Sequence, residues 1–433
     1  MNMKKYVLRD LNMEKINQLR RRPSTLDGEA FVIARKIARS VKKDGDRALV
    51  RYARELDNFN GNDFTVSQRE IIEAGKNISE SLKKALSQSR SNIYRFHKSQ
   101  LYESPPVYTT AGVKCFSLRQ PIKRVGLYIP GGTAPLVSTV LMLAIPAGLA
   151  GCPEIVLCTP PQSDGSIPAP ILFAADLCGV SEIYKIGGAQ AISMMAYGTE
   201  SVHKVDKIFG PGNKFVAAAK SIVSADPEGA AIDLPAGPSE VLIICDAGSN
   251  EKFVAADLLS QAEHDVNSQV VLVTTSEMKA EKIMKELKSQ IGVLARKEII
   301  EISLSKSFVL IVPDIESALS FSNCYAPEHL ILNIKNCRKY ISQITSAGSV
   351  FLGAYSCESA GDYASGTNHV LPTYGLAKSY SGLSVSSFQK EVFFQEVTRE
   401  GLINLNKTIG ALADAEGLAA HKRAASIRLE KQN

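Results

Sequence analysis

The chain has 433 residues, of which 45% are hydrophobic and 22% charged, and its formal net charge is +6. This composition is typical of a globular protein, and so small a charge, carried by scattered basic residues without interleaved aromatics, argues against a nucleic-acid-binding surface. The length exceeds the size at which one hydrophobic core keeps growing, so it predicts two larger units with appendages.

The N-terminus and the cysteines predict the compartment. The first six residues, MNMKKY, lead into no apolar signal core, and prolines interrupt the uncharged stretch between Arg124 and Glu154. Eight cysteines occur singly, without a Cys-x-x-Cys pair, which predicts reduced and mostly buried thiols. We therefore expect a cytoplasmic protein without a membrane span.

Taken in chain order, the sequence changes from a helical texture to alternating strands and helices. Residues 26–100 carry apolar positions at helical spacing, and from Arg124 onward short β-branched runs alternate with glycine-rich turns and apolar helices. The expected strands are 124–129, 154–158, 182–186, 204–209, 240–245, 269–274, 307–312, 330–334 and 349–352. The expected helices are 138–149, 169–178, 189–197, 214–224, 253–263, 277–290 and 315–323. This alternation predicts two α/β units with parallel-sheet cores.

The segment after Gly401 predicts a helical tail. It is rich in alanine, and one side of the helix is too apolar to stay uncovered. We therefore expect this tail to dock on its own chain or on a partner. Glu416 and His421 lie on it, and a surface helix that carries one histidine is the favoured explanation when this motif stands alone.

Two histidine motifs in the C-terminal half are candidate sites for chemistry. Gln261 and His264 stand three residues apart on a predicted helix and could chelate one metal ion, although a helix end that faces water explains this motif better when it stands alone. Glu328 and His329 follow a proline between a helix and a strand. An acid and an imidazole in such a corner could act as a general-base pair, or could be ordinary turn residues.

A polar loop and several glycine-rich turns complete the candidates. Residues 354–372 contain Glu358, Asp362, Asn368 and His369 with little aliphatic bulk, a composition typical of a binding loop. Glycine-rich turns at 130–133, 187–190, 209–214 and 236–239 could hold phosphate or carboxylate groups on their backbone amides. None matches a dinucleotide or P-loop fingerprint. The residues alone thus predict a metal-assisted α/β enzyme of open reaction type, with a zinc hydrolase and a non-catalytic metal-binding or scaffold protein as alternatives.

Seven longer motifs occur in one order along almost the whole chain. They are residues 127–132 (LYIPGG), 187–191 (GGAQA), 209–213 (FGPGN), 234–240 (LPAGPSE), 259–264 (LSQAEH), 325–329 (YAPEH) and 362–369 (DYASGTNH). Together they closely resemble the histidinol dehydrogenase family. The resemblance implies oxidation of L-histidinol through L-histidinal to L-histidine, the final step of histidine biosynthesis, with two NAD and one zinc ion per subunit.

The resemblance also assigns roles to residues. His329 would be the general base, and Glu328 would activate the water that hydrates the aldehyde. Zinc ligands carried over by motif are Gln261, His264, Asp362 and His421. The implied substrate contacts are Ser239, Gln261, His264, His329, Asp362, His369, Glu416 and His421. The implied NAD contacts are Tyr128, Gln190 and Asn213.

The fold implied by the resemblance is a homodimer of incomplete Rossmann-like units, aldehyde-dehydrogenase-like in architecture. The expected division is an N-terminal arm (1–25), a first α/β domain with the metal and catalytic motifs (26–127 and 239–383), a second α/β domain with the NAD turns (128–238) and a helical C-terminal tail (384–433). The tail would dock on the partner subunit and bring Glu416 and His421 to its site. We expect no nucleic-acid or membrane partner.

Overall fold

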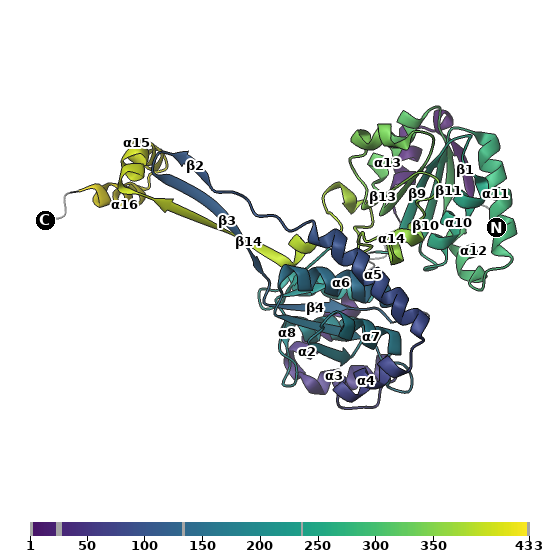
Figure 1. Cartoon of the computed structure of the whole chain (residues 1–433), viewed down its shortest axis with the longest axis horizontal. Coiled ribbons are helices and arrows are strands. Elements are labelled where there is room, and N and C mark those ends of the chain that lie inside the picture. The colour runs from purple at the N-terminus through teal and green to yellow at the C-terminus, as the bar shows by residue number, and fades with distance from the viewer. Residues whose placement is uncertain (1–2, 23–27, 132–134, 235–236, 431–433) are drawn as a thin grey trace.

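The computed structural model describes residues 3–22, 28–131, 135–234 and 237–430. These residues form two parallel sheets, each with helices on both faces, and a long antiparallel arm that projects away from them (Figure 1). The expected α/β class with two parallel-sheet cores is therefore confirmed.

The first sheet is six-stranded, and all its strand pairs are parallel. In spatial order its strands are β1 (Lys4–Val7), β11 (Phe308–Ile311), β10 (Gln269–Thr274), β9 (Glu240–Cys245), β12 (His329–Asn333) and β13 (Ser349–Leu352). The central strands β9 and β12 are buried along their whole length, which explains their almost continuously apolar sequence. The N-terminal segment is not a free arm, because β1 forms an edge of this sheet.

Helices cover both faces of the six-stranded sheet. One face packs against α10 (Glu251–Ala262), α11 (Glu277–Ile291) and α12 (Lys297–Ser305), and the other against α1 (Met13–Arg20) and α13 (Ile315–Tyr325). The helix α14 (Glu358–Tyr363) contacts α10. The 3₁₀ segments of the chain are η1 (Leu8–Asp10), η2 (Cys337–Gln343), η3 (Leu376–Lys378), η4 (Val385–Phe388) and η5 (Ile427–Leu429).

The second sheet is five-stranded and also parallel. In spatial order its strands are β6 (Glu182–Lys185), β5 (Glu154–Thr159), β4 (Arg124–Tyr128), β7 (Lys207–Phe209) and β8 (Ala231–Ile232). One face packs against α4 (Gln68–Lys76), α5 (Glu80–Lys98), α6 (Val137–Ala150) and α7 (Ala169–Leu177). The other packs against α2 (Gly28–Asp44), α3 (Asp46–Leu56), α8 (Gly188–Tyr197) and α9 (Lys214–Ala225).

The packing of α2 to α5 corrects the expected domain division. The expected division places residues 26–127 with the sheet that carries the metal and catalytic motifs. The buried faces of these helices instead join the cores of the five-stranded sheet, as Ala34 and Leu49 do beside Ile192. Their apolar stripes required a covering partner, and the pattern did not specify which sheet supplies it.

A three-stranded antiparallel arm was not expected from the sequence. It pairs β3 (Val113–Pro121) with β2 (Val107–Thr110) on one side and β14 (Gln389–Val397) on the other. At its tip α15 (Arg399–Ala415) and α16 (Ala419–Ser426) pack on each other, far from both parallel sheets (Figure 1). The C-terminal region is therefore helical as predicted only after residue 398, because a nine-residue strand precedes it.

The remaining expectations agree with the structure in most places. Every expected strand and helix overlaps an observed one, whereas the sequence patterns do not predict β1, β2, β3, β8, β14, α1, α12 and α14. Among the described residues no helix is long and apolar enough to cross a membrane. All eight cysteines are unpaired, but only three are buried, so the expectation of mostly buried thiols was wrong.

Candidate active site

Gln261 and His264 lie at the C-terminal end of α10, which Asn250 caps at its other end. The helix ends at Ala262, so His264 stands just beyond it and not on its face, with its backbone N–H 3.3 Å from the Gln261 carbonyl oxygen. The Gln261 side chain is fully buried, and neither its oxygen nor its nitrogen has a hydrogen-bond partner among the described residues. Because a buried amide without partners is costly, this side chain would be stabilised by a bound group.

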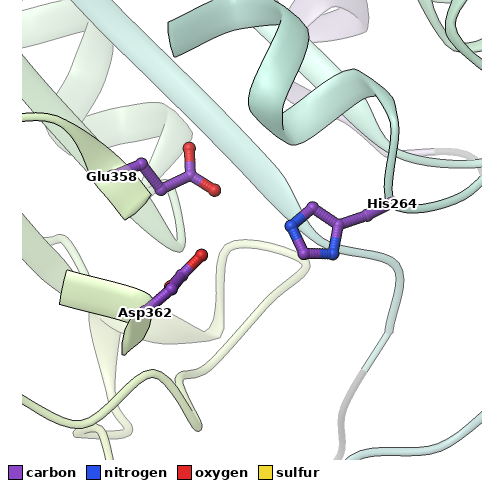
Figure 2. Close-up of side chains that lie close together, drawn as sticks. All are labelled: His264, Glu358 and Asp362. Carbon is purple, nitrogen blue, oxygen red and sulfur yellow. The ribbon is translucent and has the colours of Figure 1, made fainter. Parts of the chain in front are cut away.

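A cluster of an imidazole and two carboxylates lies beside this helix end. Glu358 and Asp362 stand four residues apart on α14 and point toward His264 (Figure 2). One ligand atom from each of the three residues lies within 4.8 Å of the others. Both Glu358 carboxylate oxygens are buried without a partner among the described residues. Glu358 is not among the predicted metal ligands, although its i, i+4 spacing from Asp362 indicates a shared face once a helix is assumed.

Glu328 and His329 stand where α13 passes into β12. Ala326 ends the helix with a left-handed φ of 52°, and His329 is the first residue of the strand. The Nδ1 atom of His329 lies 3.7 Å from the Glu328 carboxylate, and its Nε2 atom lies 3.8 Å from the Asp362 carboxylate. The expected helix-to-strand corner is confirmed, and it brings the acid–imidazole pair to the cluster.

The hydrogen bonds of His329 define its tautomer. Nδ1 lies 3.3 Å from the Glu240 carbonyl oxygen, which can only accept a hydrogen bond, so Nδ1 carries the proton. Nε2 is buried and has no partner among the described residues. The available lone pair of this ring is therefore on Nε2, at the side of Asp362.

Burial dominates the electrostatics of the cluster. It lowers the pKa of His329 to about 3 and that of His369 to about 4, so both imidazoles are neutral near pH 7. Burial also raises the pKa of Asp362 to about 7 and the pKa values of Glu328 and Glu358 above their usual range. Neutral imidazoles among carboxylates that avoid ionisation form a site that a cation would stabilise.

The donor set fits a divalent metal ion. Gln261 offers an amide oxygen, His264 an imidazole nitrogen, and Asp362 and Glu358 carboxylate oxygens. His264 is the exposed member of the cluster, and partial desolvation together with the nearby Arg296 cation lowers the pKa of its ring. Nitrogen and oxygen ligands of this kind suit zinc, and the described residues place no cysteine in the cluster. The unpartnered Oε1 atom of Gln261 and the two carboxylate oxygens of Glu358 are acceptors that such an ion would satisfy.

His369 connects the cluster to the other sheet. Its Nδ1 atom lies 3.0 Å from the Asp362 carbonyl oxygen, and its Nε2 atom lies 3.3 Å from the hydroxyl of Thr139 in the first turn of α6. That helix follows β4 of the five-stranded sheet. Ser239 directly precedes β9, and its carbonyl oxygen accepts a hydrogen bond of 3.2 Å from the Gln269 backbone N–H.

The expected tail residues lie elsewhere in this chain. Glu416 is the residue that follows α15 and caps its C-terminal end, and His421 lies on α16; both are exposed at the tip of the arm and remote from the cluster (Figure 1). Within one chain the structure therefore brings together Gln261, His264, Asp362, Glu328, His329 and His369, and leaves Glu416 and His421 apart.

The three expected NAD contacts lie at the carboxyl edge of the five-stranded sheet. Tyr128 ends β4, and its hydroxyl accepts a hydrogen bond of 2.9 Å from the Gly188 backbone N–H. Gln190 on α8 donates to Asp57 at 3.0 Å, and Asn213 caps α9. The connections from β4 run to β5 on one side, whereas β7 lies on its other side, so the strand order reverses there. Open parallel sheets bind ligands at such a reversal.

Parts of the predicted glycine-rich turns cannot be placed. Gly132 and Thr133 of the first turn and Ala236 of the last lie outside the described residues. The turn after β7 is well defined, because the buried Lys220 donates to the Gly210 carbonyl oxygen at 2.8 Å and pairs with Asp233. Asp233 also accepts a hydrogen bond from the Gly210 backbone N–H at 2.8 Å.

Comparison with known proteins assigns the family. A sequence model of the family "Histidinol dehydrogenase" matches residues 20–429. The chain is 51% identical over 415 residues to histidinol dehydrogenase of Bacteroides fragilis, with 96% of each chain covered. It is 48% identical over 430 residues to the enzyme of Vibrio parahaemolyticus, with 99% of each covered.

A solved structure agrees with this assignment. The crystal structure of histidinol dehydrogenase from Elizabethkingia anophelis superposes with a TM-score of 0.95 at 49% sequence identity, covering 99% of this chain and 98% of that chain. Sequence and three-dimensional structure thus match the same family along nearly the whole length. The chain belongs to the histidinol dehydrogenase family and is an oxidoreductase.

Proposed function

We propose that this protein oxidises L-histidinol through L-histidinal to L-histidine, the final step of histidine biosynthesis, using two NAD and one zinc ion per subunit. The observation that carries the proposal is His369, whose ring contacts Asp362 in the buried cluster and Thr139 beside the strand-order reversal of the other sheet. A substrate held at the cluster would therefore face a dinucleotide held at that reversal.

The metal would be held by Gln261, His264 and Asp362, with His421 of the partner subunit. When bound, zinc would hold and orient the imidazole and amine of the substrate, and NAD would accept the hydride. Support for this ligand set comes from the unpartnered amide of Gln261 and from the approach of His264 to Asp362. Ser239, His369 and Glu416 would contact the substrate. Glu416 would pair with the cationic amine of L-histidinol.

His329 would remove the proton of the alcohol. Its ring is neutral, its Nδ1 proton is engaged by the Glu240 carbonyl oxygen, and its Nε2 lone pair is free for a proton. A general base must be unprotonated at the working pH and must reach the proton that it accepts. The neutral ring meets the first condition, and its unpartnered Nε2, 3.8 Å from the Asp362 carboxylate, is the proposed acceptor.

Glu328 would activate water for the second oxidation. An aldehyde transfers a hydride only from a tetrahedral form such as its hydrate. A carboxylate beside the base could activate the water that adds to the aldehyde. Glu328 is buried, and its carboxylate is fixed by the Glu240 backbone N–H at 2.9 Å. Burial raises its pKa above the usual range, so this carboxylate binds a proton more tightly than an exposed one.

We also propose that the arm completes the site of a second subunit in a homodimer. Within the described chain its outer surface exposes large apolar side chains, including Tyr108 at 71%, Phe393 at 80% and Leu412 at 60%. Such a surface calls for a covering partner. A second copy that covers it would gain Glu416 and His421 near its own cluster.

The test is product identification. Zinc-loaded protein is mixed with L-histidinol and NAD, and the products are separated and identified by mass spectrometry. A sample whose zinc has been removed with a chelator is treated in parallel. We expect L-histidine and NADH from the loaded sample alone. Absence of NADH from zinc-replete protein, with hydrolysis of an ester or amide instead, would favour a zinc hydrolase. Binding of L-histidinol or NAD without any turnover would favour a non-catalytic protein.

A further inference from the structure

Glu328 and His329 form the proposed catalytic pair. The Arg22 side chain extends from the N-terminal segment to residues that contact or precede this pair. It is 7% exposed, and its Nε and Nη2 atoms both lie 2.6 Å from the Glu240 carboxylate, which is itself 2% exposed. The guanidinium also lies 3.4 Å from the ring centre of Tyr325. A cation so enclosed is held in one position by its partners.

Glu240 contacts both members of the catalytic pair through its main chain. Its N–H donates to the Glu328 carboxylate at 2.9 Å, and its carbonyl oxygen lies 3.3 Å from Nδ1 of His329. Its side chain, besides pairing with Arg22, accepts a hydrogen bond from the Tyr374 backbone N–H at 2.7 Å. A shift of Glu240 would therefore move a hydrogen bond of the acid and one of the base together.

Arg22 holds the chain on the other side of the pair as well. Its Nη1 atom donates to the Tyr325 carbonyl oxygen at 2.5 Å, and its Nη2 atom lies 3.4 Å from the carbonyl oxygen of Ala326. Ala326 has the left-handed φ that leads the chain into Glu328. One guanidinium thus connects β9 to the turn that precedes Glu328 and His329. The five fixed donors of an arginine suit these several acceptors better than the single ammonium group of a lysine.

We propose that Arg22 and Glu240 are positioning residues for Glu328 and His329, so that the N-terminal segment is part of the active-site framework. The proposal rests on the roles given above to that pair. Stability alone does not require this arrangement, because a buried ion pair can often be replaced by apolar residues without loss. What the pair supplies is a fixed geometry, and catalytic groups displaced by about 1 Å can lose about 100-fold in rate.

A cavity gives access to the Arg22 site from solvent. Its volume is about 380 Å³, and Arg22 lines it together with Gln18, Gln269 and Phe308. A small cation could therefore reach the place of the guanidinium if the side chain were removed. This permits chemical rescue, which separates a positioning role from a general loss of stability.

The experiment uses Arg22→Ala in the zinc-loaded full chain, assayed for NADH formation with L-histidinol. We expect kcat to fall about 10- to 100-fold. The KM for NAD and the zinc bound per subunit should stay near the wild-type values, because the described partners of Arg22 include none of the proposed zinc or NAD contacts. Guanidinium chloride at a non-denaturing concentration should restore kcat several-fold, whereas sodium chloride at the same concentration should not.

The matched control is Arg124→Ala. Arg124 is 8% exposed in its side chain and pairs with Glu154 and Glu182 at the far end of β4 from Tyr128. This variant also loses a buried cation, and its kcat should be unchanged with or without guanidinium. Unchanged kcat in Arg22→Ala, an equal loss in Arg124→Ala, or no rescue by guanidinium would each overturn the proposal.

Two further measurements keep the outcome decisive. If Arg22→Ala does not fold, Arg22→Lys keeps the charge but cannot reach Glu240 and both carbonyl oxygens at once, so kcat should still fall at unchanged zinc content. A wild-type kcat in a folded Arg22→Lys would overturn the proposal. If wild-type protein forms no NADH, the proposed function fails first, whereas active wild type with active Arg22 variants refutes the positioning role alone.

Discussion

At the residue scale, the site is marked by buried side-chain atoms that make no hydrogen bond. His329, Glu358 and Gln261 each keep a buried polar atom without a hydrogen-bond partner among the described residues. Such atoms are rare in folded proteins because each costs free energy. Five of them, on three residues, indicate a site for a bound group and not an arrangement that serves stability.

Removal of a cluster residue should weaken zinc binding. Loss of a residue that only supports a metal ligand costs 10- to 100-fold in affinity, so loss of a ligand should cost about 100-fold or more. We expect this for His264→Ala and Asp362→Asn in zinc titration calorimetry, and a smaller loss for Glu358→Gln. His203→Ala removes an exposed histidine outside the cluster and is the control. Wild-type affinity in His264→Ala would contradict the assignment.

Asp257 makes the stability of the metal-free protein depend on pH. Burial raises its pKa from 3.8 to about 7, so the folded protein holds this proton more tightly than the unfolded chain. The stabilisation is complete below pH 3.8 and is lost as pH rises to about 7. It amounts to at most about 4 kcal/mol, from about 1.36 kcal/mol per pKa unit.

The variant Asp257→Asn stays neutral and should escape this loss. Thermal melting of the chelated protein measures the effect at pH 5 and at pH 8. We expect the melting midpoint of the variant, relative to that of the wild type, to be higher at pH 8 than at pH 5. A difference that is the same at both pH values would show that Asp257 ionises without cost.

At the element scale, strands buried on both faces were predictable and exposed ones were not. The run from Val241 to Cys245 is continuously apolar because helices cover both sides of β9. In β14 most side chains are exposed, so no alternation against a core marks it in the sequence. Its pairing with β3 also joins segments more than 260 residues apart, which local patterns cannot show.

The candidate site was predictable to a similar degree. Most of its residues followed from the motifs that resemble the family, and the structure brings six of them together. The role of Glu358 could not be predicted, because it depends on α14, a six-residue helix within a segment read as a loop. Arg22 was also missed, because its contact with Glu240 spans 218 residues of sequence.

The buried pair of Lys220 and Asp233 should stabilise the turn after β7. Their side chains are 2% and 1% exposed, and Lys220→Met would leave a buried carboxylate without its cation. Breaking a buried pair in this way costs about 3–5 kcal/mol. We expect a lower melting midpoint and a raised KM for NAD, since the turn leads to Asn213.

The double variant Lys220→Met/Asp233→Asn provides the check on that mechanism. It removes the uncompensated charge, so it should recover part of the melting midpoint lost in the single variant. Lys42→Met breaks a more exposed pair with Asp226 and should leave the melting midpoint and the KM for NAD unchanged. A double variant that melts below Lys220→Met would contradict the charge-burial explanation.

At the scale of the whole molecule, the arm separates two expected site residues from the rest. The cluster lies between the two sheets, whereas Glu416 and His421 lie at the tip of the arm (Figure 1). If a second copy supplies these residues, each site combines the body of one subunit with the tail of the other. Mixed dimers of two inactive variants can test this arrangement.

Glu328→Gln damages the body of the site and His421→Ala the tail. Co-expression of the two variants should give about a quarter of wild-type activity, because half of the randomly formed dimers carry one intact site of two. Separate preparations of each variant should be almost inactive. Mixed dimers seen by native mass spectrometry without recovered activity would show that body and tail act within one chain.

The most direct test of the central claim is the number of NADH formed per L-histidinol, read from absorbance with limiting substrate. The claim is that one buried site performs two successive oxidations with His329 as its base. It predicts two NADH per L-histidinol for the wild type and for the control His203→Ala, and a rate lowered by orders of magnitude for His329→Ala. A yield of one NADH, or a His329→Ala variant as fast as the wild type, would contradict it.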